Sequence, residues 1–448
     1  MRRHIALSGT LAALLLVTGA AALAQTDGGL RGAPTQPELL RAAAVLNVKT
    51  GQYIRPGMIL VEHGRIAAIG ANLTAPDGAK VIDLPNLTLL PGLIDAHVHL
   101  FLHSAPPGQR VDEGGQTVHE SVAYRTILAT LHAKADLLNG FTSEKDMGTE
   151  GAGPADTAVR QLINSGRIEG PRMWISGNAI SIIGGHESAR GYNPDILIPD
   201  NATMVTGITQ LVAAIREQIH EGSTFVKMYE TGSERMVNGE YKVQYQFTEP
   251  ELAAGVEEAA REGTFVSVHD NGEPGTLYAA QAGVASIDHA TQLGPETMRL
   301  MVQKRIFAVP TFQVFEYFNS KAGGGRGGPD PVLDYKAAQF RKQIAAGVPF
   351  AMGSDVGPFP HGTQSEEFYW MVHFGLSPLA AIQAGTINGS ELFRDDKDIG
   401  SLDIGKYADI DGFTGDPLQD ITVLEHVRFV MKGGVVYKND NTQSAISY

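Results

Sequence analysis

Cysteine is absent from this chain of 448 residues. Its absence excludes disulfide bonds, thiolate metal ligands and a cysteine nucleophile. Any metal site must therefore be built from histidine, aspartate, glutamate or a modified lysine, and this donor set suits zinc or another divalent first-row ion. The stability of the fold must come from the size of its hydrophobic core, with bound metal as a further source.

Positive charge is also scarce. Lysine and arginine number 35 against 49 aspartate and glutamate residues, the net charge is −14, and no run of basic residues occurs. A nucleic-acid partner is therefore not expected, because binding to phosphates requires a basic face. Long apolar runs are missing after residue 25, since no later segment has the ~18 uncharged apolar residues of a membrane-spanning helix.

The first 24 residues read as an export signal. Arg2 and Arg3 form a positive n-region, residues 5–22 form an apolar h-region, and a small-x-small cleavage site ends at Ala24. An uncleaved membrane anchor is the alternative, but the cleavage signature favours removal. We expect a mature protein in the periplasm or outside the cell, with no membrane partner after cleavage.

Two kinds of pattern divide the rest of the chain. Residues 25–90 and 396–448 contain short β-branched or alternating runs separated by turns, and we predict that together they form a small β-sandwich domain. Residues 91–395 alternate short apolar strands with longer amphipathic helices, which is typical of βα units on a parallel sheet. The expected strands are 93–100, 140–148, 172–180, 224–230, 264–270, 285–290, 307–312 and 349–355. The predicted fold class is α/β, a (β/α)8 TIM barrel whose chemistry lies at the C-terminal strand ends.

Local signals support some of these helices. Thr248 is a plausible N-cap and Gly263 a plausible stop for a helix between them. The segment AGGGRGGPDP at 322–331 lacks the ending of a phosphate-binding loop. It is read either as a flexible loop over the site or as a solvated surface loop without function.

Histidines and one aspartate mark the strand ends. His97 and His99 are two apart on a strand and therefore point to the same face. His269 and His289 end the fifth and sixth strands, and Asp355 ends the eighth. Each has a plainer alternative: a hydrogen-bonded core histidine, or a helix N-cap for the aspartate. Their convergence on one barrel mouth favours a metal site.

Lys227 lies in VKMY, on an otherwise apolar fourth strand. Burial opposes the charged ammonium form, and a protonated amine cannot bind a cation. If the amine adds carbon dioxide, it becomes a carbamate, an anion with two oxygens that can bridge two metals. An ion pair with Glu230 is the plainer alternative.

The order HxH, Lys, His, His, Asp is joined by TINGSELF at 386–393 and GSLDIGKYADI at 400–410. Together these features resemble the amidohydrolase superfamily over residues 42–438, in particular the imidazolonepropionase-like and Xaa-Pro dipeptidase branch that includes ochratoxin-hydrolysing amidohydrolases. Two segments depart from the family pattern: FTSEKDMG at 141–148 and ADIDGFTGDP at 408–417. Neither contains a predicted ligand, but both bear on local packing and substrate choice.

The resemblance implies a pair of zinc ions. His97, His99 and Asp355 are expected on the first ion, His269 and His289 on the second, and carboxylated Lys227 between them. The zinc pair would activate water and polarise the substrate carbonyl. Asp355 is expected to take the water proton and pass it to the leaving amine. Other divalent metals also suit these ligands. Relatives are commonly multimeric, so a homo-oligomer is expected.

The expected substrate is a small-molecule amide that bears a carboxylate. The charge of two zinc ions exceeds that of carbamate, Asp355 and hydroxide, so the mouth should be locally positive. Tyr229, His186 and His361 are the candidates for holding the carboxylate, Tyr229 because the family associates a tyrosine two residues after the lysine with this role. His186 and His361 lie on loops at the catalytic face. Support of a metal ligand is the alternative for each.

These features predict a dizinc amidase that removes a C-terminal residue from N-acyl amino acids or dipeptides. Ochratoxin A, cleaved to ochratoxin alpha and phenylalanine, is the best single guess. A cyclic-amide hydrolase of imidazolonepropionase or hydantoinase type is an alternative within the enzymes. A non-catalytic exported metal-binding protein is the alternative from another class.

Overall fold

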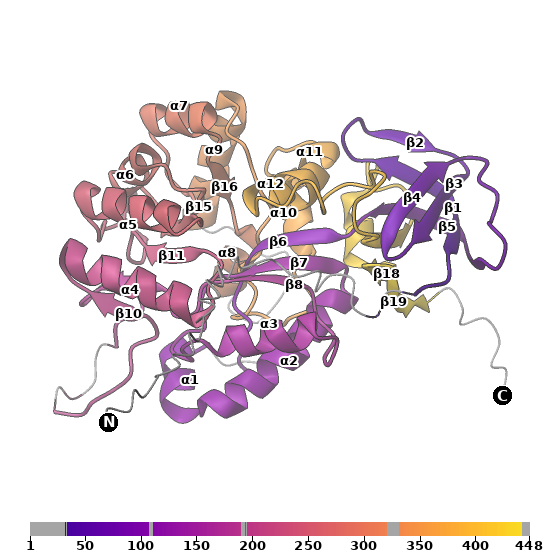
Figure 1. The fold of residues 1–448 in the computed structure, drawn as a ribbon. Helices are drawn as coiled ribbons and strands as arrows, with labels where there is room; N and C mark the ends of the chain where they lie inside the picture. Colours follow the sequence, from indigo (N-terminus) through magenta and orange to yellow (C-terminus); the bar gives the residue numbers. More distant parts are fainter. Residues whose placement is uncertain are drawn as a thin grey trace, which may run out of the picture.

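The computed structural model describes residue 32 and residues 34–106, 111–189, 193, 195–319 and 331–440. The predicted export signal lies outside these ranges, and so does the glycine-rich segment 322–331 except for Pro331. Within the described ranges, no helix combines the length and apolarity needed to cross a membrane. The chain is a mixed α/β protein in which one sheet stands beside a larger region of parallel strands and helices (Figure 1).

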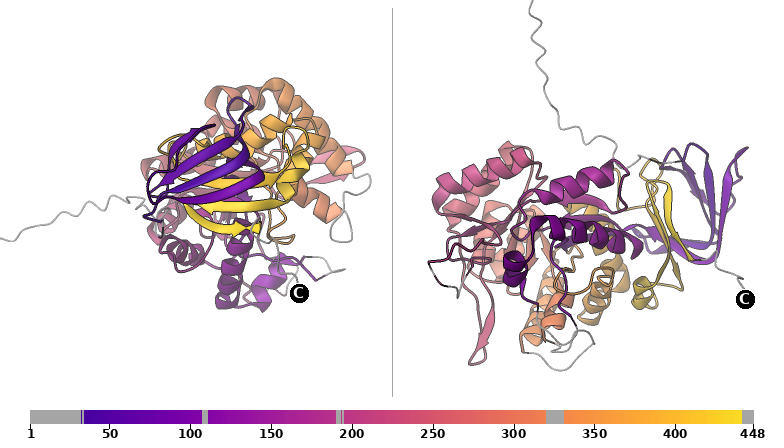
Figure 2. Two further views of the ribbon diagram at one scale, coloured as in Figure 1. Left: turned by 90° about the vertical axis from the view of Figure 1, so that its right-hand side faces the viewer. Right: turned by 90° about the horizontal axis from the view of Figure 1, so that it is seen from below.

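The separate sheet combines strands from both parts of the chain for which the sequence predicts strands. Its order is β19-β18-β17-β5-β1-β3-β4, and β2 pairs with β1. The strands are β1 Glu38–Asn47, β2 Gln52–Ile54, β3 Gly57–Glu62, β4 Arg65–Gly70, β5 Lys80–Pro91, β17 Ile410–Thr414, β18 Val427–Lys432 and β19 Val435–Asn439. Their apolar side chains share one core cluster. Figure 2 shows these indigo and yellow strands gathered at one end of the molecule.

The region that carries the predicted site contains two parallel sheets. One has the order β6-β7-β8 and the other β10-β9-β11-β14-β15-β16. The strands are β6 Leu93–Val98, β7 Phe141–Asp146, β8 Arg172–Ile175, β9 Ile180–Ile182, β10 Thr203–Val205, β11 Val226–Tyr229, β14 Val266–Asp270, β15 Ser286–His289 and β16 Phe307–Val309. Most of their residues are buried on both faces, as is usual for parallel strands that helices cover.

A few hydrogen bonds join the two parallel sheets. On one side, the Thr224 N–H donates to the Ile175 carbonyl at the end of β8, 2.8 Å away. On the other side, isolated parallel bridges join Ala308 to Phe350 and Val98 to Val356. The strands therefore form two linked sheets in place of one continuous ladder.

The predicted strand at 349–355 is not a regular strand. Phe350 forms one of these bridges, Val356 just beyond the segment forms the other, and single backbone bonds, such as the one from the Asp355 N–H to the His97 carbonyl at 2.8 Å, link the segment to β6. The Asp95 carboxylate accepts hydrogen bonds from the Ser354 amide at 3.0 Å and the Ser354 hydroxyl at 2.6 Å. Asp355 has a φ of 62°, which is left-handed and not extended. Regular pairing stops here because a side chain takes the ladder bonds and the backbone turns.

Helices surround the parallel strands (Figure 1). They are α1 Glu113–His119, α2 Val122–Leu138, α3 Ala155–Asn164, α4 Gly207–Glu221, α5 Glu249–Arg261, α6 Gly275–Ala282, α7 Pro295–Lys304, α8 Phe312–Asn319, α9 Pro331–Ala346, α10 Glu366–His373, α11 Pro378–Gln383 and α12 Gly389–Leu392. Thr248 begins α5 with a capping box to Glu251, and Gly263 follows the helix with a φ of 81°, which confirms both sequence signals.

Gly92 is the single residue between β5 of the separate sheet and β6 of the parallel region. A Cβ atom at this position would lie 2.3 Å from Thr142 Oγ1 on β7. No larger residue fits without moving β7, so the approach of the two strands requires glycine here.

Arg125 on α2 is buried and ties together the loops that follow β6 and β7. Its guanidinium donates to the Phe101 carbonyl at 3.0 Å, the Thr149 carbonyl at 3.0 Å and the Glu150 carbonyl at 2.7 Å. These three bonds fix the positions of both loops relative to the helix.

We expect Arg125→Leu to lower the free energy of unfolding by about 2–4 kcal/mol, because buried carbonyls lose charged donors. Chemical denaturation measures this loss. Arg299 pairs with Glu296 and Gln303 on the surface of α7. Arg299→Leu is the matched control and should change stability by less than about 0.5 kcal/mol. Equal stability of the two variants would contradict the role given to Arg125.

Candidate metal centre

The six predicted ligands line a single cavity of about 400 Å³. His97 lies on β6 and His99 just after it, and Lys227, His269 and His289 lie on β11, β14 and β15. Asp355 enters from the segment between β16 and β6. Residues that are far apart in the sequence thus meet where parallel strands end, which is where ligands bind in folds of this kind. The six predicted ligands among the residues that line the cavity are His97, His99, Lys227, His269, His289 and Asp355.

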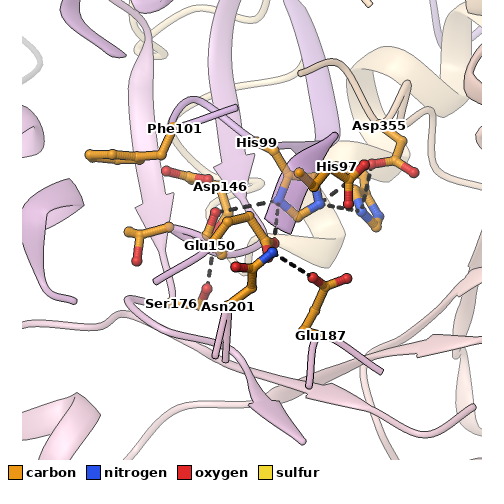
Figure 3. Close-up of polar contacts among 12 residues, drawn as sticks. His97, His99, Phe101, Asp146, Glu150, Ser176, Glu187, Asn201 and Asp355 are labelled. Atoms are coloured by element: carbon orange, nitrogen blue, oxygen red, sulfur yellow. Dashed lines mark hydrogen bonds and ion pairs between the residues drawn. The ribbon is translucent and has the colours of Figure 1, made fainter. Parts of the chain in front are cut away.

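His97 and His99 point their ring nitrogens at Asp355 (Figure 3). Nε2 of each ring lies 3.4 Å from Asp355 Oδ1, and the two Nε2 atoms are 3.3 Å apart. Burial lowers the pKa of His97 well below its usual range, so its ring is neutral and its Nε2 carries a lone pair. Lone pairs this close repel one another unless a proton or a cation lies between them.

His289 approaches the same point from β15. Its Nδ1 lies 2.7 Å from Thr311 Oγ1 and 3.9 Å from Asp355 Oδ2. His97, His289 and Asp355 each offer one ligand atom, and the three atoms lie within 4.8 Å of one another. This spacing suits a divalent ion bound by imidazole and carboxylate.

His269 and Lys227 complete the floor of the cavity. The His269 ring centroid lies 4.3 Å from that of His289, and its Nε2 lies 3.3 Å from Asn271 Nδ2. Lys227 is fully buried, and among the described residues its Nζ has no hydrogen-bond partner. Burial lowers the pKa of this amine. Its Nζ lies 4.9 Å from the centroid of the Tyr229 ring. A buried amine without a hydrogen-bond partner is unusual, and it fits a residue whose partner is a bound group.

Carboxylates hold the histidines from behind. Asp288 Oδ2 lies 2.9 Å from His97 Nδ1, which fixes the ring so that Nε2 faces the cavity. Glu150 Oε1 lies 3.1 Å from His99 Nδ1. Burial alone lowers the pKa of His99, but the hydrogen bond and charge of Glu150 with the charge of Asp355 outweigh it and raise the pKa to about 9. A cation at the cavity floor would take over the role of that proton.

The main chain is left-handed at several of these positions. His289 and Asp355 have φ values of 69° and 62°, and Glu150 and Glu187 have values of 48° and 63°. Non-glycine residues rarely adopt this conformation, and they keep it where surrounding contacts impose it. The donors are therefore held by the fold and do not simply extend from regular strands.

Tyr229 and His186, two of the three predicted carboxylate binders, lie at the cavity. The Tyr229 hydroxyl donates to Glu150 Oε1 at 3.0 Å, and His186 Nε2 lies 3.1 Å from Glu187 Oε1. The two rings are 4.9 Å apart. Both groups are thus already engaged by glutamates.

The structure does not bring His361 to the cavity. Its Nδ1 lies 2.8 Å from Asp136 Oδ2 on α2, and its ring stacks on that of His132 at 4.2 Å. The Gly362 amide also donates to Asp136, at 2.9 Å. Asp136 therefore draws the loop that contains His361 toward α2 and away from Asp355.

Four glutamates that the sequence reading did not single out also line the cavity: Glu113, Glu150, Glu187 and Glu234. Burial raises the pKa of Glu113 well above its usual range, and the charges of Glu187 and Glu150 raise it further. Burial also raises the pKa of Glu187, but the charge and hydrogen bond of His186 outweigh it and lower the pKa to about 2. Glu150 follows the second predicted strand and Glu187 follows His186. Their positions next to predicted site elements are the sequence feature that could have indicated that they line the cavity.

A family model described as "Amidohydrolase family" matches residues 88–437, and the chain belongs to that family of hydrolases. Ochratoxinase of Aspergillus niger is 28% identical over 439 residues, which cover 88% of this chain and 86% of the relative. Imidazolonepropionase of Geobacillus kaustophilus is 26% identical, with 86% and 91% covered. A crystal structure of a Xaa-Pro dipeptidase with bound methionine in the active site has a TM-score of 0.79 and 31% identity, and covers 90% of this chain and 100% of its own.

We expect Lys227→Ala to lose bound metal before it loses its fold. Removing a residue that is predicted to bridge two ions should weaken metal binding at least tenfold, by analogy with the ~10- to 100-fold losses seen when even supporting residues are removed. Elemental analysis of dialysed protein measures this loss, and added short amines or carboxylates should restore part of it. Lys432→Ala removes another buried lysine, which lies on β18 and does not line the cavity, and this variant should keep its metal. Full metal content and rate in Lys227→Ala would show that Lys227 is not a ligand.

Proposed function

We propose that this protein is a binuclear zinc amidohydrolase that cleaves the amide bond of N-acyl amino acids or dipeptides with a free C-terminal carboxylate. The observation that carries the proposal is that four imidazoles, Asp355 and the amine of Lys227 meet in one cavity, and that this amine has no hydrogen-bond partner in the part of the chain that the structure describes. Membership of the amidohydrolase family supports hydrolysis as the reaction.

The donor set fits a pair of metal ions. His97, His99 and Asp355 would hold one zinc ion and His269 and His289 the other. Burial lowers the pKa of the Lys227 amine, which favours the neutral form that can add carbon dioxide. The amine nitrogen would then bond to the carbon of carbon dioxide and release one proton, and the resulting carbamate would bridge the ions. Other divalent ions suit the same ligands.

Bound zinc would polarise the substrate carbonyl and lower the pKa of water. Asp355 is the residue placed to move the proton. Burial raises the pKa of its carboxyl, partly offset by the charges of His99 and Lys227, and this brings the carboxyl closer to the range in which it can accept a proton and release it again. Asp355 would take the proton of the attacking water and pass it to the leaving nitrogen.

The finer features of the fold belong to the same proposal. The bonds that join the two parallel sheets on both sides support a (β/α)8 barrel over residues 91–395, with residues 25–90 and 396–448 forming the β-sandwich domain. Residues 1–24 would be removed on export, which places the enzyme in the periplasm or outside the cell. We propose a homo-oligomer because members of the superfamily are commonly multimeric.

The cavity supports a charged substrate. Tyr229 and His186 are the proposed contacts for the C-terminal carboxylate, and His361 is left out because it lies on Asp136. The raised pKa of Glu113 favours its neutral form. The other cavity glutamates, Glu150, Glu187 and Glu234, add negative charge that the charge balance of metals, carbamate and Asp355 does not include. Within the proposed class they favour substrates that also carry an ammonium group, such as a dipeptide with a free N-terminus.

The proposed preference for an ammonium group can be tested with substrates that differ only in that charge. With zinc-loaded enzyme, ochratoxin A should yield ochratoxin alpha and phenylalanine, consistent with the ochratoxinase relative. A Xaa-Pro dipeptide should be cleaved with a kcat/KM at least about tenfold above that of its N-acetyl derivative, which corresponds to ~1.4 kcal/mol for the lost ammonium contact. Chromatography of the released amino acid measures both reactions.

The cyclic-amide alternative predicts another outcome. If imidazolonepropionate or a hydantoin is opened while neither ochratoxin A nor any dipeptide loses its C-terminal residue, the proposed substrate class is wrong. A protein that binds zinc and turns over none of these compounds would support the non-catalytic alternative.

Asp355→Asn should keep most of its metal and lose turnover by about 10²- to 10⁴-fold, because an amide cannot accept and return the proton. Steady-state kinetics and elemental analysis on the same sample measure the two effects. Asp83→Asn, at an exposed position on β5, is the matched control and should match the wild type. Loss of metal in parallel with activity would mean that Asp355 acts mainly as a ligand.

A further inference from the structure

Lys145 lies on β7, in the segment 141–148 that departs from the family pattern, and no role was expected for it. Its side chain is fully buried and reaches from β7 to Ser267 on β14, in the other parallel sheet. A buried lysine is expensive to keep unless its ammonium group is paired and hydrogen-bonded. The partners of Lys145 therefore show what the residue does.

Two serines and one aspartate surround the Lys145 ammonium group. Its Nζ donates to Ser267 Oγ at 3.0 Å and to Ser286 Oγ at 3.2 Å, and lies 3.8 Å from Asp288 Oδ2. The two serines are direct neighbours across β14 and β15, and their hydroxyls are 2.9 Å apart. Lys145 thus joins β7 to two strands of the other parallel sheet.

Asp288 connects this cluster to the metal centre. Its Oδ1 accepts a hydrogen bond from the Ser286 hydroxyl at 2.6 Å, while its Oδ2 lies 2.9 Å from His97 Nδ1. Donors on both sides leave the carboxylate a single orientation. That orientation sets the His97 ring, whose Nε2 faces Asp355 at 3.4 Å.

We propose that Lys145 is a positioning residue of the metal centre: through Ser286 and Asp288 it holds the His97 ring with Nε2 turned toward the metal. This inference rests on the proposed function, because it assumes that His97 binds metal. Without the ammonium group, Asp288 loses the positive charge on one side and is free to tilt, and the ring that it holds tilts with it.

Metal affinity of the full-length protein tests the inference directly. Metal-free wild type, Lys145→Met and Lys145→Arg are titrated with Zn²⁺ against a chromophoric chelator, and their Co²⁺ forms are compared by visible absorption. Lys145→Met should bind Zn²⁺ about 10- to 100-fold more weakly and show an altered Co²⁺ spectrum. Lys145→Arg, which keeps the charge, should restore most of the affinity. At saturating metal, Lys145→Met should lower kcat more than it raises KM.

Lys432→Met is the matched control. Lys432 is also buried, but its Nζ donates to the Gly170 carbonyl in another part of the molecule. It should lower the melting temperature without changing Zn²⁺ affinity. If Lys432→Met lost as much Zn²⁺ affinity as Lys145→Met, the inference would be overturned. It would also be overturned if Lys145→Met folded and bound Zn²⁺ as tightly as the wild type.

If Lys145→Met does not fold, Ser286→Ala tests the same inference. This smaller change breaks the hydroxyl link to Asp288, so weaker Zn²⁺ binding supports the inference and unchanged binding overturns it. A wild-type protein that binds no divalent metal would overturn the proposed function itself. Failure of the two proposals is therefore distinguishable.

Discussion

The crowding of ligand atoms around Asp355 is the constraint on which the rest of the structure depends. Two imidazole nitrogens 3.3 Å apart, both 3.4 Å from a carboxylate oxygen, are a stable arrangement only with positive charge among them. The surroundings maintain this arrangement by rigid means. Asp288 and Glu150 hold the far sides of the rings, and left-handed backbone at His289 and Asp355 aims the remaining donors inward. The strands point the predicted ligand side chains toward the cavity, and buried polar contacts fix the orientation of their rings and carboxylates.

Much of the centre could be predicted from sequence because strand ends obey simple geometry. Two histidines on alternate positions of one strand must share a face, and parallel strands end at one edge. Loops do not follow such rules. The place of His361 depends on Asp136, 225 residues earlier in the chain, and no local pattern reveals that contact. The irregular segment at 349–356 likewise depends on Asp95, whose carboxylate replaces ladder bonds at Ser354.

The charge of the cavity likewise depends on residues that are distant in the sequence. A charge balance based on the metal ligands alone gives a positive cavity mouth. The folded chain adds Glu113, Glu150, Glu187 and Glu234, from loops and short elements whose approach to the cavity is a tertiary property. Similarly, FTSEKDMG contains no ligand, yet its lysine reaches the His97 ring through two intermediates. No local sequence pattern predicts that these four glutamates line the cavity. None predicts the chain of contacts from Lys145 to His97 either.

The separate sheet places β5, from the first hundred residues, between β1 and β17, which comes from near the other end of the chain. During synthesis, β5 must therefore wait with one hydrogen-bonding edge open until residues 410–414 emerge from the ribosome. An open edge next to apolar side chains such as Leu87 and Leu89 is a template for pairing with other chains. A product cut short before β17 would thus be prone to aggregate even though every predicted metal ligand had already been made.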